Sequence, residues 1–343
     1  MLPLSFRIRW SLAGLLALAL LSLPSVLPAD DRLVLTVEAA DEATALAGGL
    51  EQALVRVAGL RSPEVRELVQ RLLLERDADG RIPALREGVP LEEGRFRLQF
   101  DRQSLRVALR DAGVPMVLGA RPALLVWAVH EDAGQRQLLG SGLDGPGVLA
   151  ALQALGDERG QPLMLPLADL ADRRAVQAGD VVGGVTDPLA AAGRRYGADG
   201  LVALHVRSTA EDAVARAVLA HDGREYRSEA RGATAGEAAR AAVDRGLDLL
   251  LQRLVRVPDE PEWVALGFTG VRGFAAFREL QAELTRLDAI DAARLESLRG
   301  DAVTLEVQAA VDPEALVELL RAAGYARGEA PFDDSDVEAW LRR

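Results

Sequence analysis

One stretch of the chain constrains its fold more than any other, the continuous apolar run at residues 123–129 (ALLVWAV). A strand that is apolar on both faces is typical of a sheet that helices cover on both sides. Helical periodicity follows at residues 148–155 and 189–196, and each of these segments precedes a further strand, at residues 163–167 and 200–206. Strands that alternate with helices predict parallel pairing through right-handed crossovers.

A hairpin and a long helix follow this unit. The pair Asp222-Gly223 separates two strand-like segments, residues 213–221 and 224–232, and is a strong signal for a two-residue hairpin turn. The second segment carries charged side chains that suit a protected edge strand: Arg224, Glu225, Arg227, Glu229 and Arg231. Residues 234–237 (TAGE) form a capping box for a helix that we expect to end near Val257.

The whole chain is predicted to contain three small α/β and α+β modules. Residues 116–258 form a central α/β domain, a mixed sheet with a parallel βαβαβ unit, an antiparallel hairpin and a long C-terminal helix. Residues 30–115 form an N-terminal α+β domain that contains a charged linker at residues 77–93. Residues 262–326 show the order βαββα, which suggests a ferredoxin-like α+β domain, and residues 327–343 form an acidic tail. The tail carries an apolar stripe that is a candidate for docking: Val337, Trp340 and Leu341.

The first thirty residues have the three-part pattern of a secretory signal peptide. Two arginines precede an uncharged stretch at residues 10–29, whose leucine- and alanine-rich core gives way to Pro24 and ends at the small residue Ala29. We predict a signal peptide over residues 1–29, cleavage after Ala29 and export to the periplasm, with no stable membrane insertion afterwards. The alternative is an inner-membrane anchor at residues 10–29, because an uncharged stretch of this length could just span a bilayer.

Composition excludes several kinds of chemistry. The chain has no cysteine and 3 histidines, which excludes a disulfide framework, a thiolate nucleophile and an iron–sulfur cluster and argues against a histidine-rich metal centre. The formal net charge of -12 disfavours nucleic acid, because phosphate binding requires clustered positive charge. We therefore expect no metal, no cofactor and no nucleic-acid partner.

A glycine-rich segment at residues 140–145 (GSGLDG) matches the dinucleotide-binding pattern G-x-G-x-x-G. In such a site the backbone approaches a pyrophosphate at a helix N-terminus, and an acidic residue such as Asp169 binds a ribose hydroxyl. A polar stretch at residues 130–137 separates the strand from these glycines, however, and export would remove the chain from cytoplasmic dinucleotides. We favour a hairpin tip that runs into a helix, with cation or small-molecule binding at residues 140–147 as an alternative.

Acidic residues follow the second predicted parallel strand, where the ligand sites of α/β sheets usually form. Asp169, Asp172 and Asp180 could hold a cation or act as paired carboxylates. His130 and Arg207 could face the same crevice from neighbouring strands. Helix capping and solvated loop charge are the roles that we favour for the three aspartates. The sequence has no G-x-S-x-G, H-E-x-x-H or P-loop motif, so we identify no catalytic residue and no metal ligand.

Several segments carry a resemblance to a known family: residues 120–127 (ARPALLVW), residues 159–167 (RGQPLMLPL) and residues 196–199 (YGAD). Together they resemble a family of secreted Gram-negative bacterial proteins classed as a domain of unknown function (DUF 2066). The residues that match are Arg121, Pro122, Trp127, Arg159, Gly160, Pro166, Asp169, Tyr196 and Asp199. The resemblance spans nearly the whole chain after the leader, and it implies an envelope location and no known activity.

At longer range, the central domain resembles two groups of protein-binding domains. One is the amino-terminal domain of the Tol-system periplasmic protein, and the other is the core of the lipoprotein activators of penicillin-binding proteins. Because these likenesses concern the fold, they suggest protein binding without fixing a function.

We therefore predict a non-catalytic periplasmic or envelope-associated protein that serves as an interaction or scaffold module for other envelope proteins. The alternative is a hydrolase, or a binder of cations or small molecules, that uses carboxylates at the carboxyl ends of the central parallel strands. A polar crevice at the ends of these strands would favour the alternative, and a filled surface would favour the interaction module.

Overall fold

The computed structural model of the chain describes residues 32–75, 82–140, 145, 147–332 and 337–342. The signal peptide predicted for residues 1–29 and the alternative anchor at residues 10–29 lie outside these residues and stay predictions. Residues 32–343 belong to one compact unit, whose described strands form four sheets. Helices between strands, and sheets that mix parallel and antiparallel pairs, confirm the predicted α/β and α+β fold class.

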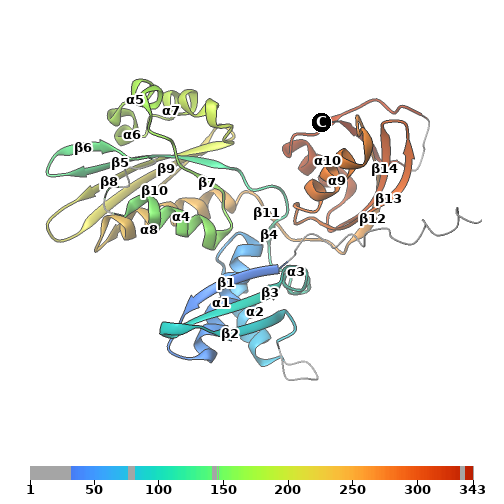
Figure 1. The fold of residues 1–343 in the computed structure, drawn as a ribbon, viewed down its shortest axis with the longest axis horizontal. Helices are drawn as coiled ribbons and strands as arrows, with labels where there is room; N and C mark the ends of the chain where they lie inside the picture. Colours follow the sequence, from blue (N-terminus) through green and yellow to red (C-terminus); the bar gives the residue numbers. More distant parts are fainter. Residues whose placement is uncertain (1–31, 76–81, 141–144, 146, 333–336, 343) are drawn as a thin grey trace, which may run out of the picture. The chain divides into compact units, whose positions relative to one another are not determined.

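The N-terminal sheet has the order β1-β3-β2, with β1 at Arg32–Glu38, β2 at Leu85–Pro90 and β3 at Arg95–Asp101. Three helices accompany it (Figure 1): α1 (Glu42–Ala58), α2 (Pro63–Leu74) and α3 (Arg102–Asp111). Strand β2 and the short 3-10 helix η1 (Glu92–Gly94) lie where a charged linker was predicted, which corrects that prediction. Five of the six residues of β2 are exposed, so no alternation of apolar side chains marks this edge strand in the sequence.

The central sheet has the order β10-β9-β8-β5-β6, and β7 pairs with the start of β5. Its strands are β5 (Leu124–Asp132), β6 (Gln135–Leu138), β7 (Leu163–Met164), β8 (Gly200–Ser208), β9 (Ala213–His221) and β10 (Arg224–Gly232). Strand β5 pairs parallel with β7 and β8, and β9 pairs antiparallel with β8 and β10, as predicted. Asp222 and Gly223 adopt φ angles of 47° and 70°, which the tight hairpin turn requires.

Helices cover both faces of the central sheet (Figure 1). Helices α4 (Val148–Arg159) and α8 (Ala235–Leu251) cover one face, and α5 (Leu170–Ala175), α6 (Ala178–Gly183) and α7 (Thr186–Gly193) lie on the other. The apolar run in β5 contributes alternate side chains to the two cores, Leu124 and Val126 to the first and Leu125 and Trp127 to the second. Helix α8 ends at Leu251 instead of near Val257, because the chain then enters β11 (Val255–Arg256), which pairs with β4 (Met116–Val117).

The C-terminal sheet has the order β13-β14-β12-β16-β15 and carries α9 (Gly273–Leu284) and α10 (Pro313–Ala322). Its strands are β12 (Glu262–Thr269), β13 (Ile290–Arg299), β14 (Ala302–Ala309), β15 (Ala326–Arg327) and β16 (Ala339–Arg342). The strand β16 comes from the predicted tail and pairs parallel to β12, where a ferredoxin-like sheet would have an antiparallel strand. Trp340 and Leu341 of the expected docking stripe are therefore buried in the chain's own sheet.

Candidate functional site

Two of the aspartates predicted for the crevice lie in one hydrogen-bonded network. Asp169 caps α5 by accepting the N–H of Asp172 at 2.9 Å, and it binds Arg195 Nη2 at 2.7 Å. Asp172 is only 1% exposed and accepts a hydrogen bond from the Tyr196 hydroxyl at 2.6 Å. Arg195 Nη1 lies 3.5 Å from Asp172 Oδ1, so one guanidinium is within ion-pair distance of both carboxylates. The sequence therefore predicted correctly that Asp169 is a cap, and the structure adds Arg195 and Tyr196.

The electrostatics of this network favour fixed protonation states. The hydrogen bond from Arg195, with help from the Asp172 N–H, holds the pKa of Asp169 at about 2. Burial raises the pKa of Tyr196, and its bond to Asp172 acts in the same direction. At neutral pH the Asp169 carboxylate is charged and the Tyr196 hydroxyl keeps its proton. Neither group is poised near pH 7, where acid–base catalysis is most effective.

The third aspartate and the glycine motif also have structural roles. Asp180 accepts the N–H of Gln177 at 3.2 Å in a capping box at the start of α6. A Cβ atom at Gly140 would lie 2.3 Å from the Ala168 Cβ, so close packing against this loop requires a glycine there. Residues 141–144 and 146 of the glycine-rich segment lie outside the described residues, and a ligand site there stays a prediction.

His130 and Arg207 do not share a crevice. Successive side chains of a strand point to opposite faces. His130 lies on the α4–α8 side, where its Nε2 is 2.9 Å from Ser208 Oγ. Arg207 lines a hollow of about 230 Å³ on the other face, together with Glu131 and His205. The five predicted crevice residues are thus divided between the Asp169–Asp172 network, a helix cap and two faces of the sheet.

A row of charged residues, of which the sequence analysis singled out only Glu229, crosses the α5–α7 face near this hollow. Glu131 Oε2 accepts a hydrogen bond from Arg136 Nε at 2.7 Å and lies 3.2 Å from His205 Nε2. Arg216, the neighbour of His205 on β9, binds Glu229 on β10 at 2.7 Å. Burial lowers the pKa of His205, and the bond with Glu131 opposes this effect. Only the strand register brings these residues together, and no local motif marks them.

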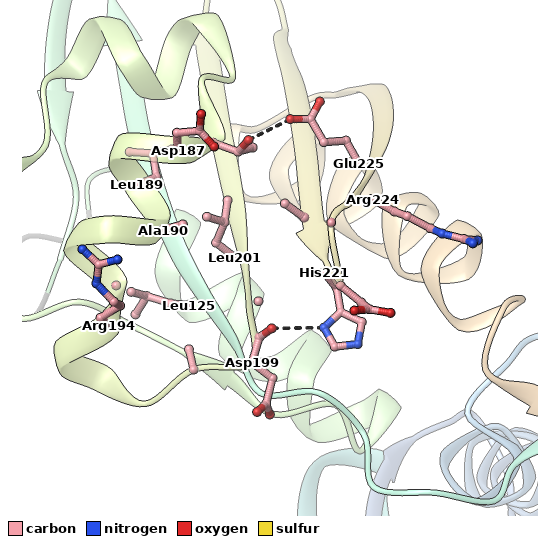
Figure 2. A pocket seen from close by; sticks show the side chains of 17 residues that line it. Leu125, Asp187, Leu189, Ala190, Arg194, Asp199, Leu201, His221, Arg224 and Glu225 are labelled. Carbon is pink, nitrogen blue, oxygen red and sulfur yellow. Dashed lines mark hydrogen bonds between the residues drawn. The ribbon is translucent and has the colours of Figure 1, made fainter. Parts of the chain in front are cut away.

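A larger hollow on the same face lies at the amino end of β8, next to α7 and the β9–β10 turn (Figure 2). It has a volume of about 560 Å³ and an apolar floor made by Leu125, Leu189 and Leu201. The hollow is also lined by polar residues: Asp187, Arg194, Asp199, His221, Asp222, Arg224 and Glu225. The Thr186 hydroxyl donates to Glu225 at 2.8 Å, and His221 Nδ1 lies 3.1 Å from the Asp199 carbonyl oxygen. We call this hollow the α7 pocket.

The two arginines near the α7 pocket differ in direction. Figure 2 shows Arg194 beside α7, whereas the Arg224 side chain extends from β10 away from the floor. Within the described part of the chain, neither arginine forms an ion pair. The Thr186 hydroxyl donates to Glu225 instead of to His221, so the described rim contains no hydroxyl nucleophile bonded to an imidazole base.

Most residues that carry the family resemblance bind backbone groups. The Arg121 guanidinium donates to the carbonyls of Arg56 and Val57 at the end of α1, and to those of Arg159 and Gly160 at the end of α4. Helix C-termini carry unpaired carbonyls, which a cation stabilises.

Four further matched residues lie around β5: Pro122, Trp127, Tyr196 and Asp199. Asp199 Oδ2 accepts the Ala123 N–H at 2.8 Å, and Gln161 donates to the Pro122 carbonyl at 2.6 Å. Trp127 packs edge-on against Tyr196, with ring centroids 6.3 Å apart. These residues are therefore determinants of the fold.

A comparison of the chain with protein-family profiles, with curated proteins and with solved structures found no match. In the part of the chain that the structure describes, no helix is long and apolar enough to cross a membrane. Among the same residues, no group of three or more His, Cys, Asp or Glu side chains is arranged to hold a metal ion.

Proposed function

We propose that this chain is a non-catalytic interaction protein of the bacterial envelope and that it receives a side chain of a partner protein in the α7 pocket. The observation that carries the proposal is the open apolar floor between two charged sides. Binding hot spots commonly bury an aromatic or aliphatic anchor in such a pocket, and charged groups around it set orientation and exclude wrong partners.

The placement of the acidic residues supports binding over hydrolysis. Asp169 and Asp172 are close together, but Asp172 is buried beneath Tyr196 and both carboxylates share Arg195. A general acid or base must reach the substrate with a pKa near the working pH. A polar hollow of about 230 Å³ does lie at the carboxyl ends of β5 and β8, where α/β enzymes bind their substrates. Its Glu131 carboxylate is bonded to Arg136 and lies 3.2 Å from His205 Nε2. The larger α7 pocket lies at the amino end of β8.

Photo-crosslinking from the pocket tests this proposal. Ala190 is exposed and lines the pocket, whereas its neighbour Ala191 on α7 is exposed but does not line it. A photoreactive side chain at position 190, in the full chain expressed in its native envelope, is expected to give one dominant adduct with a second protein. The same group at position 191 should give little of that adduct. Equal adducts from both positions, or none from either, would contradict the proposal.

The envelope location rests on the predicted leader. We expect the protein to accumulate in the periplasmic fraction with Asp30 as its first residue, because the segment before it has the features of a cleaved signal peptide. N-terminal sequencing of the fractionated protein measures this directly. A mature protein that begins at Met1 and stays with the inner membrane would instead support the anchor.

A further inference from the structure

Strand β10 is an edge of the central sheet, and half of its backbone groups point away from β9. His221 and Arg224 flank the two-residue turn, so they form a hydrogen-bonded pair and the even-numbered residues of β10 bond to β9. The odd-numbered residues therefore present their N–H and C=O groups outward. The Glu229 carbonyl agrees with this pattern, because it accepts a hydrogen bond at 2.6 Å from Arg245 of α8.

The outward-pairing residues carry a symmetrical pattern of charge. Residues 225, 227, 229 and 231 lie on one face of β10 and are all exposed: Glu225, Arg227, Glu229 and Arg231. The two residues on each side of Ser228 have opposite signs at equal distances. Reversing the strand about Ser228 therefore places an acidic residue at each basic position and a basic residue at each acidic position.

We propose that β10 pairs antiparallel with β10 of a second copy of this chain, with Ser228 on the two-fold axis. In this register Glu225 lies opposite Arg231 of the second copy, and Arg227 lies opposite Glu229 of the second copy. The symmetry repeats both pairs, which gives four complementary cross-strand contacts on one face. The residues that face each other are the odd-numbered ones, whose free backbone groups can complete the ladder.

Charge selects this register over its neighbours. A slip that places Arg227 or Glu229 on the axis brings each of these residues opposite its own copy and also pairs like charges farther along the strand. Like charges directly opposite each other destabilise a sheet. Charges on an edge commonly prevent pairing with other strands. The charged side chains of β10 therefore disfavour pairing with most other strands, but they complement those of a second copy of β10.

The helix beneath the edge adds apolar surface. Arg245 reaches the Glu229 carbonyl, so this side of α8 flanks the edge, and Leu249 follows one turn later with 42% of its surface exposed. Tyr226, two residues from Ser228, is half-buried on the α8 side of β10. Pairing brings these side chains of the two copies together. In the paired form the Glu229 carbonyl accepts a hydrogen bond from an N–H of the second copy instead of from Arg245.

The ion pairs that β10 forms within its own chain do not prevent its charged residues from pairing with a second copy. Arg227 binds Glu225 at 2.6 Å and Arg216 binds Glu229 at 2.7 Å, and both pairs are exposed. Exposed pairs are weak and exchange partners readily. Within the described residues, Arg231 forms no ion pair.

Sedimentation equilibrium of the full-length purified protein, at about 25 mM and about 500 mM salt, tests the proposal. We expect a dimer at low salt that weakens at high salt. Arg227→Glu alone and Glu229→Arg alone should each weaken the dimer at least about tenfold, because each makes two like-charge contacts. The double variant Arg227→Glu, Glu229→Arg restores opposite charges and should restore the dimer.

Arg224→Glu is the matched control. It makes the same charge change on the same strand, but position 224 lies opposite Gly232 in the proposed register, so the dimer should persist. Circular dichroism establishes that each variant is folded. A monomer under all conditions would overturn the proposal, as would a dimer that the single reversals leave intact or that the double variant fails to restore.

Discussion

The hydroxyl of Tyr196 has two partners, the buried Asp172 carboxylate and the N–H of Leu167 at 2.9 Å. Tyr196→Phe leaves a buried carboxylate without this donor, so we expect it to lower the free energy of unfolding by about 1–3 kcal/mol. Urea denaturation measures the loss. Tyr226→Phe is the control, because the Tyr226 hydroxyl has no hydrogen bond with the described residues. Equal stability of the two variants would show that the Asp172 contact does not stabilise the fold.

The lowered pKa of Asp169 predicts that the stability of the folded chain depends on pH. Its pKa is lowered to about 2 in the folded chain, mainly by Arg195, so the unfolded state binds the proton more readily. The pKa of Asp169 in the unfolded chain is about 4, and above this pH its contribution to stability is complete. The contribution is lost as the pH falls through about 2, the pKa in the folded chain. Asp169→Asn should melt earlier than the parent protein at pH 7, and the difference should shrink as the pH approaches 2. A difference that stays constant with pH would contradict this assignment.

Single residues also show how far the sequence can predict a site. Asp169, Asp172 and Asp180 stand out in the sequence because they follow a strand, and the capping roles of Asp169 and Asp180 follow from local spacing. Arg195 is the missing part of the site. Its contact with Asp169 joins residues 26 positions apart, because the short 3-10 turn Arg194–Tyr196 after α7 lies next to the start of α5.

At the scale of elements, the loop before α5 packs against the end of β6 through Gly140. The Gly140→Ala variant introduces a Cβ that would lie 2.3 Å from Ala168 Cβ and 3.0 Å from the Pro166 carbonyl oxygen. We expect a loss of about 1–3 kcal/mol from this overpacking. Gly179→Ala in α6 is the control, because its Cβ meets nothing within 4 Å, and it should stabilise the helix by up to about 1 kcal/mol. Thermal melting compares the two, and an unchanged Gly140→Ala protein would refute the packing role.

Arg121 joins the ends of two helices, α1 and α4, through four carbonyl groups. Burial lowers its pKa to about 10, so it is charged at neutral pH. Arg121→Met leaves buried carbonyls unpaired, and we expect a loss of at least about 2 kcal/mol in chemical denaturation. Arg71→Met removes an exposed contact with Glu75 and should cost less than about 0.5 kcal/mol. Similar losses of unfolding free energy in Arg121→Met and Arg71→Met would contradict the stabilising role of Arg121.

The strands and helices that the sequence predicted best are those with a strong local signal. The apolar run of β5 and the Asp-Gly turn between β9 and β10 both have one, and both were predicted with bounds close to those observed. Strands β2 and β6 were missed, because they are short, exposed and polar, and pairing with a neighbour defines them.

At the scale of the whole molecule, contacts between distant segments were beyond the reach of sequence patterns. Three arginines on one face of α3 meet two aspartates at the start of β13, more than 180 positions away: Arg102, Arg106, Arg110, Asp288 and Asp291. Spacing on the helix shows that these arginines share a face, but nothing local identifies their partners. The burial of Trp340 has the same origin, because its neighbour Gly267 lies in another strand.

The central claim is that the conspicuous acidic residues hold the fold together while the α7 pocket binds a partner. Two variants separate these roles: Ala190→Arg blocks the pocket from an exposed position, and Asp169→Asn weakens the network. The decisive measurement is partner recovery after crosslinking in the envelope, set beside the melting temperature of each variant. We predict that Ala190→Arg loses the partner at an unchanged melting temperature, and that Asp169→Asn melts earlier but keeps the partner. Loss of the partner from Asp169→Asn with normal melting, and full recovery with Ala190→Arg, would contradict the account.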